Sequence, residues 1–242
     1  MIQVFYKEIN NFFNSLTAYI VVIVFLTTIG LLMWVFPDTN VLQYGFADME
    51  TLFRLGPYVF MFLVPAITMR MFSEEKKSGT IEILFTRPLS DYEIILGKYL
   101  ASVVLVLFSL IPTLLYYYSI YTLGSPPGNI DTAGVIGSYI GLALLGSVFA
   151  SIGLLASSLT ENQVVAFILS VFLCFIFYDG FQSMAAINVW SKVTALINRL
   201  SIAYYYNDLS RGLIDMTSIL YFLSVIAYML LLTKFVTGRR KW

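Results

Sequence analysis

Six long apolar stretches constrain the fold of this 242-residue chain more than any other feature of its sequence. A helix needs roughly 20 mostly apolar residues to cross a hydrocarbon core about 30 Å thick. The stretches lie near Leu16 to Phe36, Phe53 to Phe72, Tyr99 to Leu123, Val135 to Leu159, Val164 to Met184 and Met216 to Phe235. Barrel strands alternate apolar and polar residues, whereas these runs are apolar on every side. The sequence therefore predicts one all-α domain over residues 1–242, an integral membrane bundle of six transmembrane helices.

The distribution of lysine and arginine predicts how the bundle is oriented. Hydrophobic residues make up 59% of the chain and charged residues 12%. A six-span topology places one group of cations on the side of the termini: Lys7, Arg70, Lys76, Lys77, Arg87, Lys98, Lys234, Arg239, Arg240 and Lys241. The smaller group on the other side is Arg54, Lys192, Arg199 and Arg211. Because cytoplasmic loops carry the excess of positive charge, we expect both termini in the cytoplasm.

The sequence offers little material for a catalytic or metal site. It has no histidine, and its single cysteine is Cys174, in the fifth predicted span. These residues exclude an internal disulfide, a Cys/His metal cluster and a Ser/His pair, so we predict no catalytic residue and no metal site. The carboxylates of Glu74, Glu75 and Glu82 are interpreted as interface or solvated charges rather than as an acid–base pair.

Residues 1–15 carry the pattern of an amphipathic helix. The apolar residues Ile2, Phe5, Ile9, Phe12 and Phe13 recur at helical spacing, and polar residues fall largely between them. This pattern predicts an interfacial helix that braces the bundle or contacts a partner. The alternative is an irregular start to the first span.

The segment 73–98, between the second and third spans, is dense in charge and in helix-terminating residues. Ser78, Gly79 and Thr80 are expected to end one helix and to cap a short second one over residues 80–86. Pro88 prevents its continuation, and Ser90 with a glutamate three residues later predicts a capping box at the next helix.

The short helix at 80–86 exposes the apolar residues Ile81, Ile83, Leu84 and Phe85. An apolar face on a short cytoplasmic helix indicates that a partner covers it. The alternative is that these residues lie on the bilayer surface.

The fourth span contains Gly137, Gly141, Gly146 and Gly153 at several small-xxx-small spacings. Such spacings favour close helix packing, within the chain or between two copies. The alternative is a translocation surface.

The segment 185–215, between the fifth and sixth spans, is apolar for an external loop. We expect short external re-entrant or interfacial helices there, with a gate-like role for which Tyr205 and Arg211 are candidates. Asp179, at the end of the fifth span, is a third gate candidate, because an ionisable residue at membrane depth is often functional. The alternative is that Asp179 simply ends its helix.

Three runs of residues in the charged segment resemble the segment that joins spans two and three in type-2 ABC transporter permeases. The runs are Glu75 to Leu84, Thr86 to Ser90, and Leu96 to Lys98. The run from Ser210 to Asp215, directly before the last span, looks like the same family, particularly its bacterial gliding-motility (GldF-like) and NosY-like branches.

This resemblance implies a membrane subunit of an exporter in the bacterial cytoplasmic (inner) membrane. It implies a dimer, with a second copy or with a related permease, that rests on two ATP-hydrolysing subunits. The helix at 80–86 would be the coupling helix that contacts an ATPase subunit. The residues that carry the match, and that we therefore expect to couple the two subunits, are Glu75, Gly79, Thr80, Glu82, Leu84, Arg87 and Pro88.

The sequence contains no ATP-hydrolysing motif of its own. A phosphate-binding P-loop requires GxxxxGK[ST], but Gly97 and Lys98 are followed by Tyr99. We therefore expect no enzymatic activity and no cofactor on this chain, with ATP and Mg on the partner ATPase. Membrane lipid is an expected contact, and nucleic acid is not.

Two other functions fit the sequence. An ion-coupled secondary transporter would place ionisable groups near the centres of its spans, where this sequence has none. A membrane scaffold would bind a cytoplasmic partner through the same charged segment without changing the partner's ATPase rate.

Overall fold

The structure, a computed structural model, describes residues 1–43, 45–81, 90–186 and 198–238. All regular secondary structure within these ranges is helical, and six helical segments are long and apolar enough to cross a membrane. These spans are Leu16–Trp34, Glu50–Lys77, Asp91–Leu123, Thr132–Leu159, Gln163–Met184 and Met216–Gly238. They confirm the predicted all-α bundle of six spans, and the chain is a multi-pass membrane protein.

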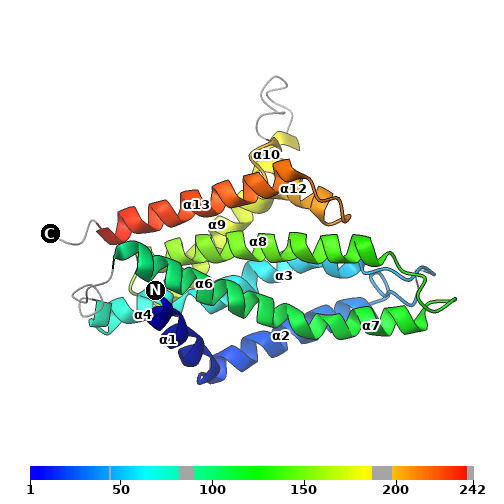
Figure 1. Ribbon diagram of the computed structural model, residues 1–242, viewed down its shortest axis with the longest axis horizontal. Coiled ribbons are helices and arrows are strands. Elements are labelled where there is room, and N and C mark those ends of the chain that lie inside the picture. Colours follow the sequence, from blue (N-terminus) through cyan, green and yellow to red (C-terminus); the bar gives the residue numbers. More distant parts are fainter. Residues whose placement is uncertain (44, 82–89, 187–197, 239–242) are drawn as a thin grey trace.

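Several spans consist of consecutive helical pieces. The elements in chain order are α1 (Ile2–Phe13), α2 (Leu16–Trp34), α3 (Glu50–Thr68), α4 (Arg70–Lys77), α6 (Asp91–Leu110), η1 (Ile111–Thr113), α7 (Leu114–Leu123), α8 (Thr132–Leu159), α9 (Gln163–Phe175), η2 (Ile176–Gly180), α10 (Phe181–Ala186), α12 (Ile202–Leu209) and α13 (Met216–Gly238). Figure 1 shows the spans side by side, with the start of α1 and the end of α13 at one end of the bundle. We call this the terminal end and the opposite one the loop end.

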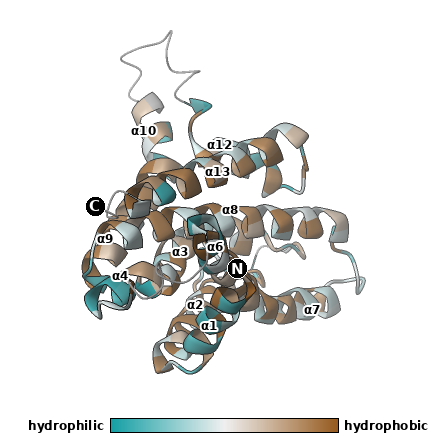
Figure 2. Ribbon diagram, turned by 60° about the vertical axis from the view of Figure 1, so that its left-hand side comes forward, coloured by the Kyte–Doolittle hydropathy of each residue, from teal (hydrophilic) through white to brown (hydrophobic). Residues whose placement is uncertain are grey.

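Helix α8 lies at the centre of the bundle, packed against α3, α6, α9 and α13. Most of its residues are buried, whereas only a minority of those in α2, α9 and α13 are. Figure 2 shows hydrophobic residues over the spans and hydrophilic ones concentrated in α1 and α4. The exposed apolar faces are those that a bilayer covers.

Glycines let the centre of the bundle pack closely around α8. A β-carbon built on Gly137 would lie 2.8 Å from the Cα of Gly212, and one on Gly141 would lie 2.7 Å from the Cβ of Leu209. Both contacts join α8 to the segment that precedes the last span. Because no side chain fits between them, the two backbones approach directly.

The other two predicted packing glycines contact the spans on the far side of α8. A β-carbon on Gly146 would lie 2.6 Å from Cγ1 of Val106 in α6, and one on Gly153 would meet Thr68 of α3. The contacts at these glycines thus lie within one chain.

A serine of α8 bridges the joint between α3 and α4. Met69 separates the two helices. The Ser157 hydroxyl accepts hydrogen bonds from the backbone N–H groups of Phe72 and Ser73, at 3.0 and 3.1 Å. It donates to the Met69 carbonyl at 2.9 Å. One buried side chain therefore satisfies three backbone groups at the joint.

Two other spans are irregular for identifiable reasons. Pro112 interrupts the third span at η1, because proline has no N–H to donate within a helix. The fifth span passes through a π-helical turn, η2, that contains Asp179, and then continues into α10. The alternative that Asp179 ends its helix is therefore wrong, because the π turn accommodates the residue without terminating the helix.

Helix α1 packs against the start of α6, as expected of a helix that braces the bundle. Its buried residues are Val4, Glu8 and Phe12. The predicted apolar face is partly wrong, because Ile2 is exposed and a carboxylate occupies the buried stripe. The reason lies in α6, where Gly97 lets the backbone of α1 approach so closely that a β-carbon there would meet Val4 at 3.1 Å.

The segment between the fifth and sixth spans folds back onto the bundle. Helix α12 packs against α8, α13 and η2 (Figure 1). Residues 187–197 of the predicted gate segment, 185–215, lie outside the described part of the chain.

Candidate functional site

The predicted coupling segment, 73–98, begins within α4 at the terminal end of the bundle. Gly79 follows with φ +69°, a left-handed conformation that glycine adopts without strain, and the chain turns helical again at Thr80. Most of the predicted helix at 80–86 lies outside the described residues, as do the coupling candidates Glu82, Leu84, Arg87 and Pro88.

The chain re-enters the described part at the start of α6, with the predicted capping box. The Ser90 hydroxyl accepts a hydrogen bond from the Glu93 N–H, and the Glu93 carboxylate accepts one from the Ser90 N–H at 2.9 Å. The capping box fixes the residue at which α6 begins.

Four charged residues meet at the terminal end, and we call them the charge cluster: Lys7, Glu8, Glu75 and Lys98. Lys98 Nζ lies 2.6 Å from Oε1 of Glu8 and 2.9 Å from Oε2 of Glu75. Lys7 Nζ lies 2.5 Å from Oε1 of Glu75. The cluster therefore joins α1 to α4 and α6. These last two helices precede and follow residues 82–89 in the chain.

Lys98 is the centre of this cluster and has no exposed surface. Its ammonium also donates a hydrogen bond to the Met71 carbonyl at 2.6 Å and lies 5.1 Å from the centre of the Phe72 ring. A lysine buried this completely is stable as a cation only if carboxylates and hydrogen bonds replace its water.

Glu75 is buried along with Lys98, at 8% exposure. Its interpretation as a solvated charge is therefore wrong, because Lys98 of α6 and Lys7 of α1 both lie against its carboxylate. The three coupling candidates of the described part thus differ in surroundings: Glu75 is buried in the cluster, whereas Gly79 and Thr80 are exposed in the turn that follows.

Further contacts attach other spans to the same end. Lys76 donates a hydrogen bond to the Ser158 carbonyl of α8. Lys234 of α13 lies over the ring of Tyr92 in α6, with Nζ 3.7 Å from its centre. The two flanks of the coupling segment are therefore connected to α1, α8 and α13.

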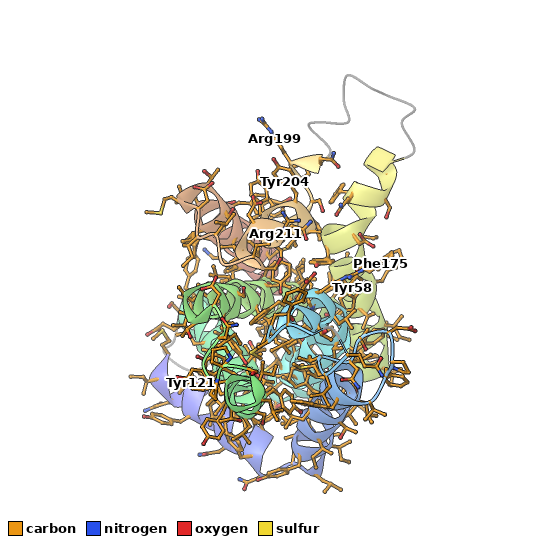
Figure 3. The ribbon with its side chains drawn as sticks, turned by 90° about the vertical axis from the view of Figure 1, so that its right-hand side faces the viewer. Tyr58, Tyr121, Phe175, Arg199, Tyr204 and Arg211 are labelled. Atoms are coloured by element: carbon orange, nitrogen blue, oxygen red, sulfur yellow. The ribbon has the colours of Figure 1, made fainter. Side chains whose placement is uncertain are left out.

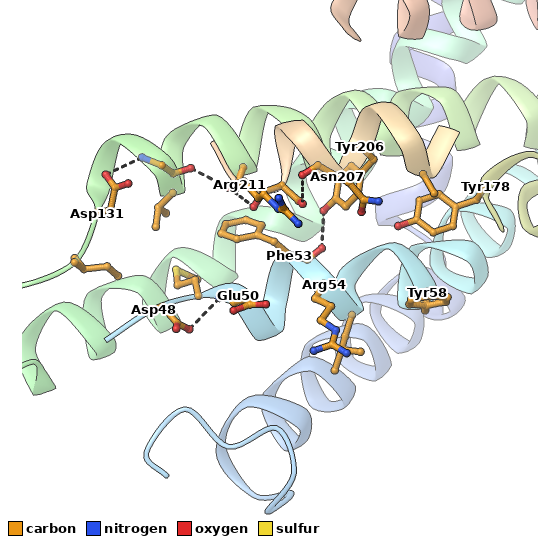
Figure 4. Close-up of a pocket in the computed structure, with 18 of the residues that line it drawn as sticks. Asp48, Glu50, Phe53, Arg54, Tyr58, Asp131, Tyr178, Tyr206, Asn207 and Arg211 are labelled. Carbon is orange, nitrogen blue, oxygen red and sulfur yellow. Dashed lines mark hydrogen bonds between the residues drawn. The ribbon is translucent and has the colours of Figure 1, made fainter. Parts of the chain in front are cut away.

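The loop end contains a pocket of about 770 Å³ between α3, the start of α8, η2 and α12 (Figure 4). Of the three gate candidates, Asp179 and Arg211 line it and Tyr205 does not. The Tyr205 ring is stacked on Tyr221 of α13, with ring centres 4.0 Å apart. The structure thus places Asp179 and Arg211 at one pocket, whereas Tyr205 packs between α12 and α13. Figure 3 views the molecule from this end and labels Arg211.

Aromatic residues form the inner wall of the pocket. Tyr206 donates a hydrogen bond to the Phe53 carbonyl at 2.7 Å, and burial raises the pKa of Tyr206 well above its ordinary value of 10.0. The Tyr178 ring lies between Tyr58 and Tyr206, at centre distances of 5.9 and 6.1 Å. Because the Tyr206 phenol stays protonated, it keeps its hydrogen bond to Phe53, which joins α12 to α3.

Two of the carboxylates that line the pocket accept backbone hydrogen bonds at the N-termini of helices. Asp131 accepts a hydrogen bond from the Gly134 N–H at the start of α8, and Asp48 accepts one from the Glu50 N–H at the start of α3. Among the described residues, no group of three or more His, Cys, Asp or Glu side chains could hold a metal ion.

Comparison with protein families identifies the class to which this architecture belongs. Residues 3–238 match the model of the ABC-2 family transporter protein. The chain belongs to the ABC-2 transporter family. The match covers all six spans, and members of this family are membrane components of transporters that typically work with an ABC ATPase. A comparison with curated proteins finds no match.

Sequence reasoning missed most of the charge cluster of this ABC-2 permease. A local signal was present for one member, since Val4, Glu8 and Phe12 are spaced four residues apart and so share one face of a helix. A carboxylate between two apolar residues on that face needs a buried cation. Tyr58 and Tyr206 of the pocket had no comparable signal, because they are two of many tyrosines in an aromatic chain.

Proposed function

We propose that this ABC-2 permease is the membrane subunit of an ATP-driven exporter, coupled to two separate ATP-hydrolysing subunits through the helix at 80–86. The observation that supports this most strongly is the charge cluster. It joins both flanks of the coupling segment to α1 by ionic contacts of 2.5 to 2.9 Å.

The contacts of the flanks provide a route from the coupling segment to the spans. A displacement of residues 82–89 acts first on α4 and α6, the helices on either side. Because the buried Lys98 binds carboxylates of both α1 and α4, these three helices respond together. Lys76 and Ser157 extend the connection to α8, the central helix.

In this proposal the terminal end faces the cytoplasm of a bacterial cell, and the ATPases with their ATP and Mg bind there. A second permease chain, identical or related, completes the transporter in the cytoplasmic membrane. The loop end then faces outward, and the pocket with Asp179 and Arg211 lies on the side where an exporter releases its cargo. The resemblance of the run from Ser210 to Asp215 supports a place in the gliding-motility (GldF-like) or NosY-like branch.

The test is purification in mild detergent through a tag at the C-terminus, followed by measurement of ATPase activity in the complex. Glu82→Lys should lower ATP turnover while the permease still inserts in the membrane, because the charge is reversed in the first turn of the coupling helix. Glu74→Lys is the matched control, since Glu74 is exposed on α4 outside the charge cluster.

Each contrary result has a distinct meaning. An ATPase that co-purifies but turns over ATP independently of the permease and of Glu82 supports a scaffold. A complex that contains no ATPase supports a secondary transporter. Loss of membrane insertion in Glu82→Lys contradicts the coupling role of the segment.

A further inference from the structure

The loop-end pocket has the size of a small-molecule site and a mixed lining. Its volume of about 770 Å³ is in the range of pockets that enclose drug-sized ligands. Four carboxylates and two guanidinium groups line it, so negative charge is in excess. The carboxylates are Asp48, Glu50, Asp131 and Asp179, and the guanidinium groups are Arg54 and Arg211.

Three of the carboxylates have roles in the fold. Asp48 and Asp131 accept backbone hydrogen bonds at helix starts. Glu50 lies in the first turn of α3, four residues before Arg54, a spacing that places the two charges on one face of the helix. These groups stabilise helix N-termini and offset the positive charge of the arginines.

Asp179 is the exception. Within the described part of the chain its carboxylate has no hydrogen bond and no cation within 4.0 Å. It is close enough to the phenols of Tyr58 and Tyr178 to act on both electrostatically. The π turn of η2 thus places an unpaired carboxylate at the pocket, near two tyrosines.

Tyr178 supplies a second, independent observation. The residue is 5% exposed, and its hydroxyl has no hydrogen-bond partner among the described residues. Figure 4 shows this hydroxyl directed into the pocket, toward the region between Tyr58 and Tyr206. The hydroxyl therefore has its hydrogen-bonding capacity free toward the contents of the pocket.

We propose that this pocket binds an organic cation with an apolar body. The positive group lies against the Asp179 carboxylate and the exposed ring of Tyr58, which attracts cations through its quadrupole. The apolar body lies along Phe53 and Tyr206. The inference that such a cation is the transported cargo rests on the proposed export function. The inference that the cation binds in the pocket does not.

Two ions of nearly equal size and shape and of opposite charge test the proposal: tetraphenylphosphonium and tetraphenylborate. The full chain in nanodiscs of a zwitterionic lipid is dialysed to equilibrium against each ion, with empty nanodiscs as the blank. The phosphonium should bind more tightly than the borate. Asp179→Asn should weaken phosphonium binding by about tenfold, the effect of losing one charged contact of roughly 1.4 kcal/mol.

Matched variants control for damage to the fold. Asp208→Asn removes a carboxylate from α12 outside the pocket lining and should leave binding unchanged. Tyr58→Leu removes an aromatic ring that lines the pocket and should weaken phosphonium binding. Tyr178→Phe keeps its ring and should change this binding little, because tetraphenylphosphonium has no hydrogen-bonding atom. Tyr204→Phe, on the exposed face of α12, should have no effect.

Three results overturn the proposal: preferred binding of tetraphenylborate, equal binding of both ions, or an Asp179→Asn affinity equal to that of Asp208→Asn. If Asp179→Asn does not fold, unchanged phosphonium binding by Tyr58→Leu also overturns it. The assay contains no ATP and no ATPase, so its outcome is independent of the test of the export function.

Discussion

The ammonium of Lys98 lies 2.6 Å from the carboxylate of Glu8, although 90 residues separate them in the chain. This contact places the first helix of the protein on the N-terminal part of its third span. It also buries the Lys98 ammonium away from water. The stability of this site therefore depends on the other members of the charge cluster, Lys7, Glu8 and Glu75.

Replacement of Lys98 should be among the most destabilising changes at the terminal end. Lys98→Met leaves Glu8 and Glu75 buried without their shared cation, which costs about 3 to 5 kcal/mol. Lys7→Met should cost less, because the Lys7 side chain is 47% exposed. The midpoint of thermal unfolding in detergent measures both effects.

A compensating variant separates charge from packing. In Lys98→Met combined with Glu8→Gln and Glu75→Gln, no unpaired charge is buried, and most of the lost stability should return. If this triple variant unfolds as early as Lys98→Met alone, the ionic interpretation of the cluster is wrong.

Gly212 should tolerate alanine far less than Gly45 does. Both have positive φ, +79° and +73°, so alanine strains each backbone by about 1 to 2 kcal/mol. A β-carbon on Gly212 would also collide with the backbone of Gly134, whereas one on Gly45 meets nothing within 4 Å. The difference between the two unfolding midpoints measures the close contact between α8 and the α12 segment. Equal shifts would show that this contact does not stabilise the fold.

Tyr206→Phe should destabilise the protein by about 1 to 3 kcal/mol, because it leaves the Phe53 carbonyl without its buried donor. Tyr204→Phe, at an exposed position on the same helix, should change stability by less than about 0.5 kcal/mol.

The same tyrosine should also affect stability in alkali. The pKa of Tyr206 is raised in the folded protein, so its contribution is complete below pH 10.0 and declines as the pH rises above that value. Unfolding measured from pH 8 to 11 should therefore show a smaller alkaline loss in Tyr206→Phe than in the wild type. A steeper loss in the variant would contradict the assignment.

Ser157→Ala removes the group that satisfies three backbone atoms at Met69, Phe72 and Ser73. The expected cost is about 1 to 3 kcal/mol, because the N–H groups of Phe72 and Ser73 lose this acceptor, whereas the Met69 carbonyl keeps its bond from the Ser73 hydroxyl. Ser151→Ala is the control on the same helix, since the Ser151 hydroxyl bonds only to the nearby Val148 carbonyl. Hydrogen exchange at the amides of Phe72 and Ser73 should rise in Ser157→Ala alone.

The parts of the fold that local sequence determines could be predicted. The spans follow from apolar length, and the start of α6 follows from Ser90 and Glu93, which are three residues apart. These signals need no knowledge of which helices are neighbours.

The charge cluster and the pocket could not be predicted in the same way. Their residues come from helices that are distant in sequence, such as Lys7 and Glu75, which are 68 positions apart. The local structure at Asp179 also depends on tertiary packing, because the residue lies in a π turn inside the fifth span and not at a helix end. Of the gate candidates, only Asp179 and Arg211 came together at the pocket.

The hydroxyl of Ser157 has a mechanical consequence for the second span. Because it bonds to Met69 at the joint and to Phe72 and Ser73 in the first turn of α4, α4 cannot swing about this joint unless hydrogen bonds to α8 break. A displacement of α4 that keeps these bonds must therefore carry α8 with it. Helix α8 also contains Gly137, which lies against Gly212, so α8 connects the joint at Met69 to the segment beside the pocket.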